Sequence, residues 1–271
     1  MDLLVEQRHR VLHVTLNRPE KRNALSLAMC AGIADAITAA QTDASIGSIV
    51  ISASGQVFSS GMDLDEAIST NELDMAVVHE KLFTIGAHSL KPIVIAVNGA
   101  ALGGGLGLVA QGHVVVAENS SVFGLPEIRI GLWPFLVYRA VEAAVGPRRT
   151  LALSLTGSTF TADEALAWGL IHRKCHDDEV CDRGAAMARD LAKACPAAIA
   201  AGMQYARDAR EKTWEEAGKL AASLREKLMS SEDFREGCGA HKAHRDPQWP
   251  SMPSNFYPAQ KKHNGQPNQR R

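Results

Sequence analysis

Three segments of the sequence combine residue types that could stabilise charge or move protons. Residues 98–107 form a loop with five glycines, and residues 58–63 form a shorter loop around Gly61. A glycine loop that leads from a buried strand into a helix exposes backbone N–H groups at a positive helix end, which favours an anion. The third segment holds Glu127 between Pro126 and Ile128. Partial burial there is expected to raise the pKa of the Glu127 carboxyl, which suits it to take and return protons near neutral pH.

The spacing in the long glycine loop does not match the common phosphate-binding motifs. The dinucleotide pattern G-x-G-x-x-G fails because residue 108 is leucine, and no Gly-Lys-Ser/Thr phosphate loop is present. Taken alone, the loop has an alternative reading in which its glycines only allow a helix to pack closely on a sheet. The loop by itself therefore leaves its function open.

Other residues with reactive side chains lack the neighbours that their chemistry needs. No G-x-S-x-G motif surrounds Ser59 or Ser60, which argues against a serine nucleophile. His172 and His176 flank a cysteine without a third ligand at zinc-like spacing, so we expect no metal site. We expect His79, like His88, to be exposed or to cap a helix rather than to act in catalysis.

Composition and charge exclude several classes of protein. The chain has 271 residues with 29 basic and 30 acidic groups, and this net charge of -1 gives no overall attraction to nucleic acid or to an anionic membrane. The apolar stretch 93–117 contains six glycines and several polar residues, which is untypical of a membrane span. The five cysteines form no C-x-x-C pair, and the first ten residues do not resemble a signal peptide. These features predict a cytoplasmic protein with reduced thiols.

The order of the expected elements predicts an α/β fold. Short β-branched runs at 11–17, 47–52 and 92–98 read as strands, and helices are expected at 26–40 and 106–111. From residue 147 the sequence is mainly helical, with a capping box at Thr161 and Glu164 that explains the acidic pair there. We expect a core over residues 1–195, a helical region over 196–249, and a disordered tail over 250–271.

Taken together, the motifs resemble the crotonase superfamily, the enoyl-CoA hydratase and isomerase family. The matching pieces occur in the family's order: N-R-P-E-K-R-N-A-L from Asn17, F-S-S-G-M-D-L from Phe58, A-V-N-G-A-A-L-G-G-G from Ala96, F-G-L-P-E from Phe123, and L-T-G-S-T-F-T-A-D-E-A-L-A-W-G-L from Leu155. The resemblance covers roughly residues 3–249. The resemblance implies a crotonase-like spiral of ββα units followed by a helical C-terminal region. It also implies that residues 196–249 form oligomer contacts and that the protein is a homotrimer or homohexamer.

The resemblance also implies an acyl-CoA substrate and assigns the site residues. The thioester carbonyl would lie between the backbone N–H groups of Met62 and Gly104, with Glu127 as a catalytic carboxylate. The substrate-binding residues implied in the same way are Arg22, Asn23, Ala24, Leu25, Ser60, Asp63, Leu64, Gly103, Trp133 and Phe135. Asp63 has an alternative role as a turn residue only. No cofactor is implied, because coenzyme A is part of the substrate.

The family's second carboxylate is missing, which bears on the reaction. Its position is Gly107, and Phe135 stands in a segment that makes the pocket wall bulkier and more apolar than in hydratases. Hydration calls for two positioned carboxyl groups, whereas moving a double bond needs one base, so a single glutamate favours isomerisation. The alternatives are hydration, if Asp63 or Glu66 replaces the missing acid, and an acyl-CoA binder without turnover. We expect Gly107→Glu to restore the second carboxyl group and raise hydration modestly.

Overall fold

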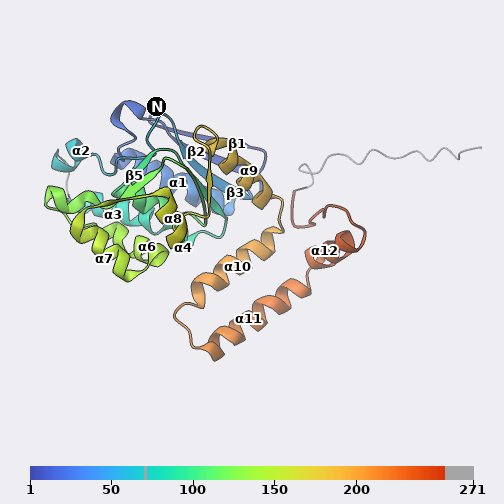
Figure 1. Ribbon diagram of the computed structural model, residues 1–271. Helices are drawn as coiled ribbons and strands as arrows, with labels where there is room; N and C mark the ends of the chain where they lie inside the picture. Colours follow the sequence, from blue (N-terminus) through green and yellow to red (C-terminus); the bar gives the residue numbers. More distant parts are fainter. Residues whose placement is uncertain (70–71, 254–271) are drawn as a thin grey trace, which may run out of the picture.

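The computed structural model describes residues 1–69 and 72–253, and its body is built on two β-sheets (Figure 1). The larger sheet has the strand order β1-β2-β3-β4-β6-β9, and only the β1–β2 pair is antiparallel. Its strands are β1 Leu3–Arg8, β2 Val11–Leu16, β3 Ser48–Ala53, β4 Ile93–Val97, β6 Val114–Glu118 and β9 Arg173–Cys175. The three strands expected from the sequence are β2, β3 and β4, with ends shifted by at most one residue.

The smaller sheet gives the fold its spiral course. It contains β5 Ala100–Leu102, β7 Val122–Gly124 and β8 Thr159–Thr161, with β5 and β7 parallel. The chain passes twice from the large sheet into the small one, from β4 to β5 and from β6 to β7, and a helical segment follows each time. This repetition of two strands and a helix is the ββα spiral that the sequence predicts.

Helices surround the sheets and form the C-terminal region. In the body they are η1 Pro19–Lys21, α1 Leu27–Thr42, α2 Leu64–Ser69, α3 Glu72–Phe83, α4 Ile85–His88, α5 Gly104–Val109, η2 Pro126–Ile130, α6 Phe135–Val145, α7 Pro147–Thr156, α8 Ala162–Trp168 and α9 Val180–Ala192. Helix α1 begins after Ser26, whose side chain accepts a hydrogen bond from the Met29 N–H, as an N-cap should. Helix α5 begins two residues earlier than expected, because Gly103 with φ +53° already turns the chain into it.

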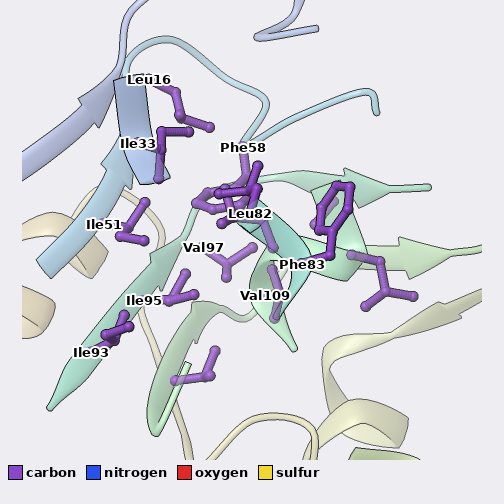
Figure 2. Packing of buried hydrophobic residues seen from close by; sticks show 14 of the residues in the cluster. Leu16, Ile33, Ile51, Phe58, Leu82, Phe83, Ile93, Ile95, Val97 and Val109 are labelled. Atoms are coloured by element: carbon purple, nitrogen blue, oxygen red, sulfur yellow. The ribbon is translucent and has the colours of Figure 1, made fainter. Parts of the chain in front are cut away.

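The central strands are buried on both faces because their side chains alternate between two helical layers. Ile49 and Ile51 of β3 join the main core cluster, where Ile33 of α1 packs against them (Figure 2). Val50 points the other way and packs with Ala188 of α9. The continuous apolar runs of β3 and β4 follow from this double coverage.

The C-terminal helices extend away from the body. Helices α10 Pro196–Asp208, α11 Trp214–Met229 and α12 Glu232–Lys242 follow α9, and Figure 1 shows α10 and α11 side by side beyond the two sheets. The expected tail over 250–271 falls mostly outside the described residues. No helix in the described ranges combines the length and hydropathy needed to cross a membrane.

Two helical glycines test how closely α9 packs on the sheet. A Cβ at Gly184 of α9 would lie 2.8 Å from the Cβ of Ala96, whereas a Cβ at Gly218 of α11 would meet nothing within 4 Å. Alanine favours a helix over glycine by up to about 1 kcal/mol, and overpacking costs about 1–3 kcal/mol. We therefore expect Gly184→Ala to lower the free energy of unfolding in urea and the control Gly218→Ala to raise it. Equal shifts in both variants would contradict this packing.

Candidate active site

Two backbone N–H groups converge where the sequence places the oxyanion hole. Leu25 donates to the Gly61 carbonyl at 2.7 Å and accepts from the Asp63 N–H at 3.1 Å, so the N–H of Met62 faces away from this bridge. Gly104 is the first residue of α5, and a Cβ on it would lie 3.7 Å from the Met62 nitrogen. Within residues 1–69 and 72–253, neither N–H donates to a protein acceptor. Both donors are therefore free for a carbonyl oxygen between them.

Glycine is required where these two segments touch. Gly61 has φ +99°, and a Cβ on it would lie 2.9 Å from the Leu102 carbonyl oxygen. Gly103 has φ +53° on the other side of the contact. An isolated bridge between Ser59 and Ala101 holds the two loops in parallel. The glycines of both loops therefore serve close packing and the oxyanion site together, so the two readings of the sequence are compatible.

The carboxyl group of Glu127 lies next to these amides. A Cβ on Gly103 would be 3.0 Å from Glu127 Oε1, and Glu127 Oε2 is buried without a hydrogen-bond partner in the described structure. Burial raises the pKa of Glu127, and a hydrogen bond from its own backbone opposes this rise. The sequence predicted this direction from the apolar neighbours. A desolvated carboxyl group beside an oxyanion site is suited to proton transfer.

A cavity of about 680 Å³ contains both the amides and the carboxyl group. Its polar groups are few, and its wall is mainly apolar. Phe135 is 75% exposed at this cavity, and Trp133 stacks on Tyr138 with ring centroids 6.1 Å apart. The predicted site residues that line the cavity are Leu25, Ser60, Met62, Leu64, Gly103, Gly104, Glu127, Trp133 and Phe135.

Four of the predicted binding residues are not on the cavity wall, namely Asp63 and the three loop residues Arg22, Asn23 and Ala24. The side chain of Asn23 is fully buried, accepts from the Arg18 N–H at 2.8 Å, and donates to the carbonyls of Ser54 and Val57. Arg22 adopts left-handed backbone geometry after η1, and its carbonyl accepts from Ser60. The Asn23 side chain therefore holds the loop together, and contacts of this loop with substrate stay a prediction.

Asp63 and Glu66 have structural partners. Asp63 pairs with Arg18 at 2.5 Å, which lowers the pKa of the Asp63 carboxyl, and its Oδ1 accepts from the first N–H groups of α2. Glu66 Oε2 accepts from the Leu27 N–H at 2.7 Å. Neither side chain lines the cavity. The alternative role of Asp63 as a turn residue therefore fits the structure, and neither carboxylate is placed to replace the missing acid.

The expectation for Gly107 was wrong. We expected Gly107→Glu to restore the second carboxyl group, but a Cβ on Gly107 would lie 2.2 Å from Val137 Cγ1 and 3.2 Å from Phe83 Cδ1. The side chain of Val137, which lines the cavity from α6, fills that space. Gly107→Glu alone would therefore collide with packed side chains instead of restoring a carboxyl group.

His79 is a pocket residue that the sequence interpretation missed. It is only 7% exposed and lines the cavity together with Met75 and Phe83, which are one helical turn away on either side along α3. The expectation of an exposed or capping histidine was wrong for His79, although His88 is exposed. The spacing of residues 75, 79 and 83 was the available signal, because it places all three on one helix face. No group of three or more metal-ligating side chains occurs in the described part of the chain.

Comparison with known proteins places the whole site in one family. The family model described as enoyl-CoA hydratase/isomerase matches residues 6–252. The mevalonyl-coenzyme A hydratase of Aspergillus fumigatus is 33% identical over 256 residues, covering 88% of this chain and 91% of the relative. The 2,3-dehydroadipyl-CoA hydratase of Escherichia coli is 33% identical over 252 residues, covering 91% and 97%. A probable enoyl-CoA hydratase of Dictyostelium discoideum, named mitochondrial, is 31% identical over 250 residues, covering 90% and 89%.

Solved structures share the fold over nearly the whole chain. An enoyl-CoA hydratase from Mycobacterium smegmatis has a TM-score of 0.86 at 28% identity, covering 92% of this chain and 99% of that one. Human enoyl Coenzyme A hydratase domain-containing protein 3 has a TM-score of 0.86 at 27% identity, covering 92% and 100%. The predicted spiral fold is thereby confirmed.

The burial of Glu127 leads to a prediction about how the stability of the protein depends on pH. A raised pKa means that the native state holds this proton more tightly than the unfolded state does, so stability falls as pH rises through the folded pKa. Glutamine stays neutral. We therefore expect Glu127→Gln to have a higher melting temperature than the parent at slightly alkaline pH, and a smaller advantage at acidic pH. The control is Glu211→Gln at an exposed carboxylate, and an advantage for Glu127→Gln that did not grow with pH would contradict the burial argument.

Proposed function

The chain belongs to the enoyl-CoA hydratase/isomerase family of the crotonase superfamily, and within this family of acyl-CoA enzymes we propose that it isomerises 3-enoyl-CoA to 2-enoyl-CoA. The observation that supports the proposal is that Glu127 is the one carboxyl group among the described residues that line the cavity. Val137 fills the space beside Gly107, where a second carboxyl group would have to stand. One base in an apolar site suits a proton shuttle.

The reaction needs one proton to leave and one to return. In the proposed mechanism the Glu127 carboxylate takes a proton from the α carbon of the 3-enoyl thioester. The electron pair of that C–H bond shifts toward the carbonyl, and a dienolate forms with negative charge on the thioester oxygen. The protonated Glu127 then gives the proton to the γ carbon, and the double bond moves to the 2 position. The step is neutral overall and requires no cofactor.

The proposed oxyanion hole would lower the barrier to this dienolate. The N–H groups of Met62 and Gly104 have no other acceptor in the described structure, and the backbone holds them in place before the substrate arrives. Removing one such donor from an enzyme typically costs about 2.7–4 kcal/mol of barrier. The raised pKa of Glu127 complements this donor pair, because a stronger base takes the α proton more readily.

Hydration of 2-enoyl-CoA is the second candidate. The relatives favour it by name, because they are a mevalonyl-coenzyme A hydratase, a 2,3-dehydroadipyl-CoA hydratase and a probable enoyl-CoA hydratase. Against it stands the cavity wall, where the described residues include no second acid to help position water. The differing names of the relatives leave the acyl group of this chain's substrate open. A cytoplasmic location stays a prediction, since one relative is named mitochondrial.

We also propose that α10, α11 and α12 mediate assembly into a homotrimer or homohexamer. These helices enclose a second cavity of about 790 Å³ with an almost entirely apolar wall that includes Leu224, Leu228 and Phe234. Phe234 is 43% exposed on this face. An apolar groove on helices that extend from the body is a surface that a partner copy would cover.

The activity prediction concerns Glu127 directly. We expect the parent to convert 3-hexenoyl-CoA to the conjugated 2-hexenoyl-CoA, followed by the thioester's ultraviolet absorbance. Glu127→Gln should lower kcat at least about 100-fold with KM within a few fold, because it removes proton transfer and changes little of the shape. Glu211→Gln serves as the matched control and should behave as the parent does. A parent that hydrates crotonyl-CoA efficiently and leaves 3-hexenoyl-CoA unchanged would overturn the isomerase proposal in favour of hydration.

The assembly prediction compares two neighbouring positions on α11. Leu228 lines the apolar groove, whereas Lys227 is exposed and does not. Placing a carboxylate in an apolar interface leaves it without a partner after desolvation, so Leu228→Glu should shift the sedimentation mass toward the monomer. Lys227→Glu should keep the mass of the parent. A monomeric parent would refute the proposed assembly.

A further inference from the structure

His79 is a polar side chain buried in the cavity without a protein partner. It lies on α3, is 7% exposed, and lines the same cavity as Glu127 and the two amides. No hydrogen bond joins its imidazole to any other side chain or backbone group in the described ranges. The imidazole nitrogens are not among the fully buried unpartnered atoms, so they are open to the cavity, and a ligand that covers them without a hydrogen bond leaves them unpaired. Such a group in a ligand cavity points to a partner on the ligand.

The surroundings of His79 keep its ring neutral. Burial lowers the pKa of the imidazole, and the carboxylate of Glu66 opposes this by a smaller amount. The ring of Phe83 lies 5.9 Å away between ring centroids. A neutral imidazole offers one N–H donor and one nitrogen acceptor. Its best partner is therefore a group that can both donate and accept.

The position of His79 assigns it to the far end of an acyl chain. Phe83 Cζ lies 3.4 Å from the place that a Cβ on Gly104 would take, so the Phe83 ring adjoins the oxyanion site. Figure 2 shows Phe83 beside Leu82 in the core cluster. His79 lies one turn of α3 from Phe83, and the two rings are neighbours. An acyl chain that runs from the oxyanion site along the Phe83 ring would therefore meet the imidazole next.

We propose that His79 is a specificity-determining residue that selects acyl-CoA thioesters with a hydroxyl group toward the end of the acyl chain. The inference rests on the proposed acyl-CoA function and adds the class of acyl group. A hydroxyl matches the donor and acceptor of the neutral ring. A carboxylate is disfavoured there because the imidazole is neutral and the negative charge of Glu66 already acts on this part of the cavity. A plain hydrocarbon leaves the buried ring unpaired, which a site built for a hydrogen bond discriminates against.

The test measures binding, so that it does not depend on turnover. Saturated thioesters cannot isomerise or take up water, and the probes are hexanoyl-CoA and derivatives with a hydroxyl on the fourth, fifth or sixth carbon. We expect calorimetry with the parent to show one derivative binding at least about tenfold more tightly than hexanoyl-CoA. His79→Leu should remove this preference, and His79→Gln should retain part of it, because glutamine also offers a donor and an acceptor. The matched control is Met75→Leu, an apolar exchange one turn away on the same cavity wall, which should keep the preference of the parent.

The possible outcomes distinguish a failure of the proposed role of His79 from a failure of the proposed acyl-CoA function. Equal binding of hexanoyl-CoA and all three derivatives by the parent would overturn the role of His79 and leave the acyl-CoA function standing. An unchanged preference in His79→Leu would also overturn it, since the selection would then come from another group. Failure of every probe to bind would overturn the acyl-CoA function and the inference together.

Discussion

The close approach of two glycine-containing loops is the constraint on which the site depends. A Cβ on Gly61 would lie 2.9 Å from the Leu102 carbonyl oxygen, so the loops approach this closely because Gly61 carries no Cβ, and both Gly61 and Gly103 adopt positive φ. This contact brings the backbone of Gly104 next to the Met62 nitrogen. The rigid β3 and β4 strands, buried between α1 and the C-terminal part of α9, fix the ends of these loops. An oxyanion hole acts through preorganisation, so the packed sheet is part of the chemistry.

The apolar wall around these amides determines which proton chemistry the site can perform. Burial without a partner for Oε2 raises the pKa of Glu127, and the same desolvation makes that carboxyl a stronger base once it is ionised. Val137 excludes a second acid by occupying the volume next to Gly107. Gly107 and Val137 belong together, since any side chain at residue 107 would displace Val137. The proposed isomerisation uses such a cavity to move a proton along the substrate.

The polar groups of the cavity follow a simple division. In the proposed function the backbone amides hold the thioester oxygen, Glu127 moves the proton, and His79 contacts the acyl chain beside Phe83. Two acids near the cavity have structural partners, since Asp63 pairs with Arg18 and Glu66 accepts from the first N–H of α1. The proposal therefore assigns reaction and selectivity to different elements, the loops and η2 for the first and α3 for the second. Such separation allows the substrate range to change while the chemistry is kept.

The sequence by itself determined the α/β class, the starts of α1 and α8, the two glycine loops and the desolvated Glu127, while the spiral was expected from the resemblance of its motifs to the family. The first four follow from local pattern, such as alternating burial, capping residues and apolar neighbours of one carboxyl. Only the tertiary structure decided what meets Gly107, because Val137 comes from a helix 30 residues further along the chain, and nothing local predicts that contact. It also decided that Asn23 secures a loop and that His79 faces the cavity. A side chain's surroundings come from segments distant in sequence, so its role depends on packing that residue type and spacing do not encode.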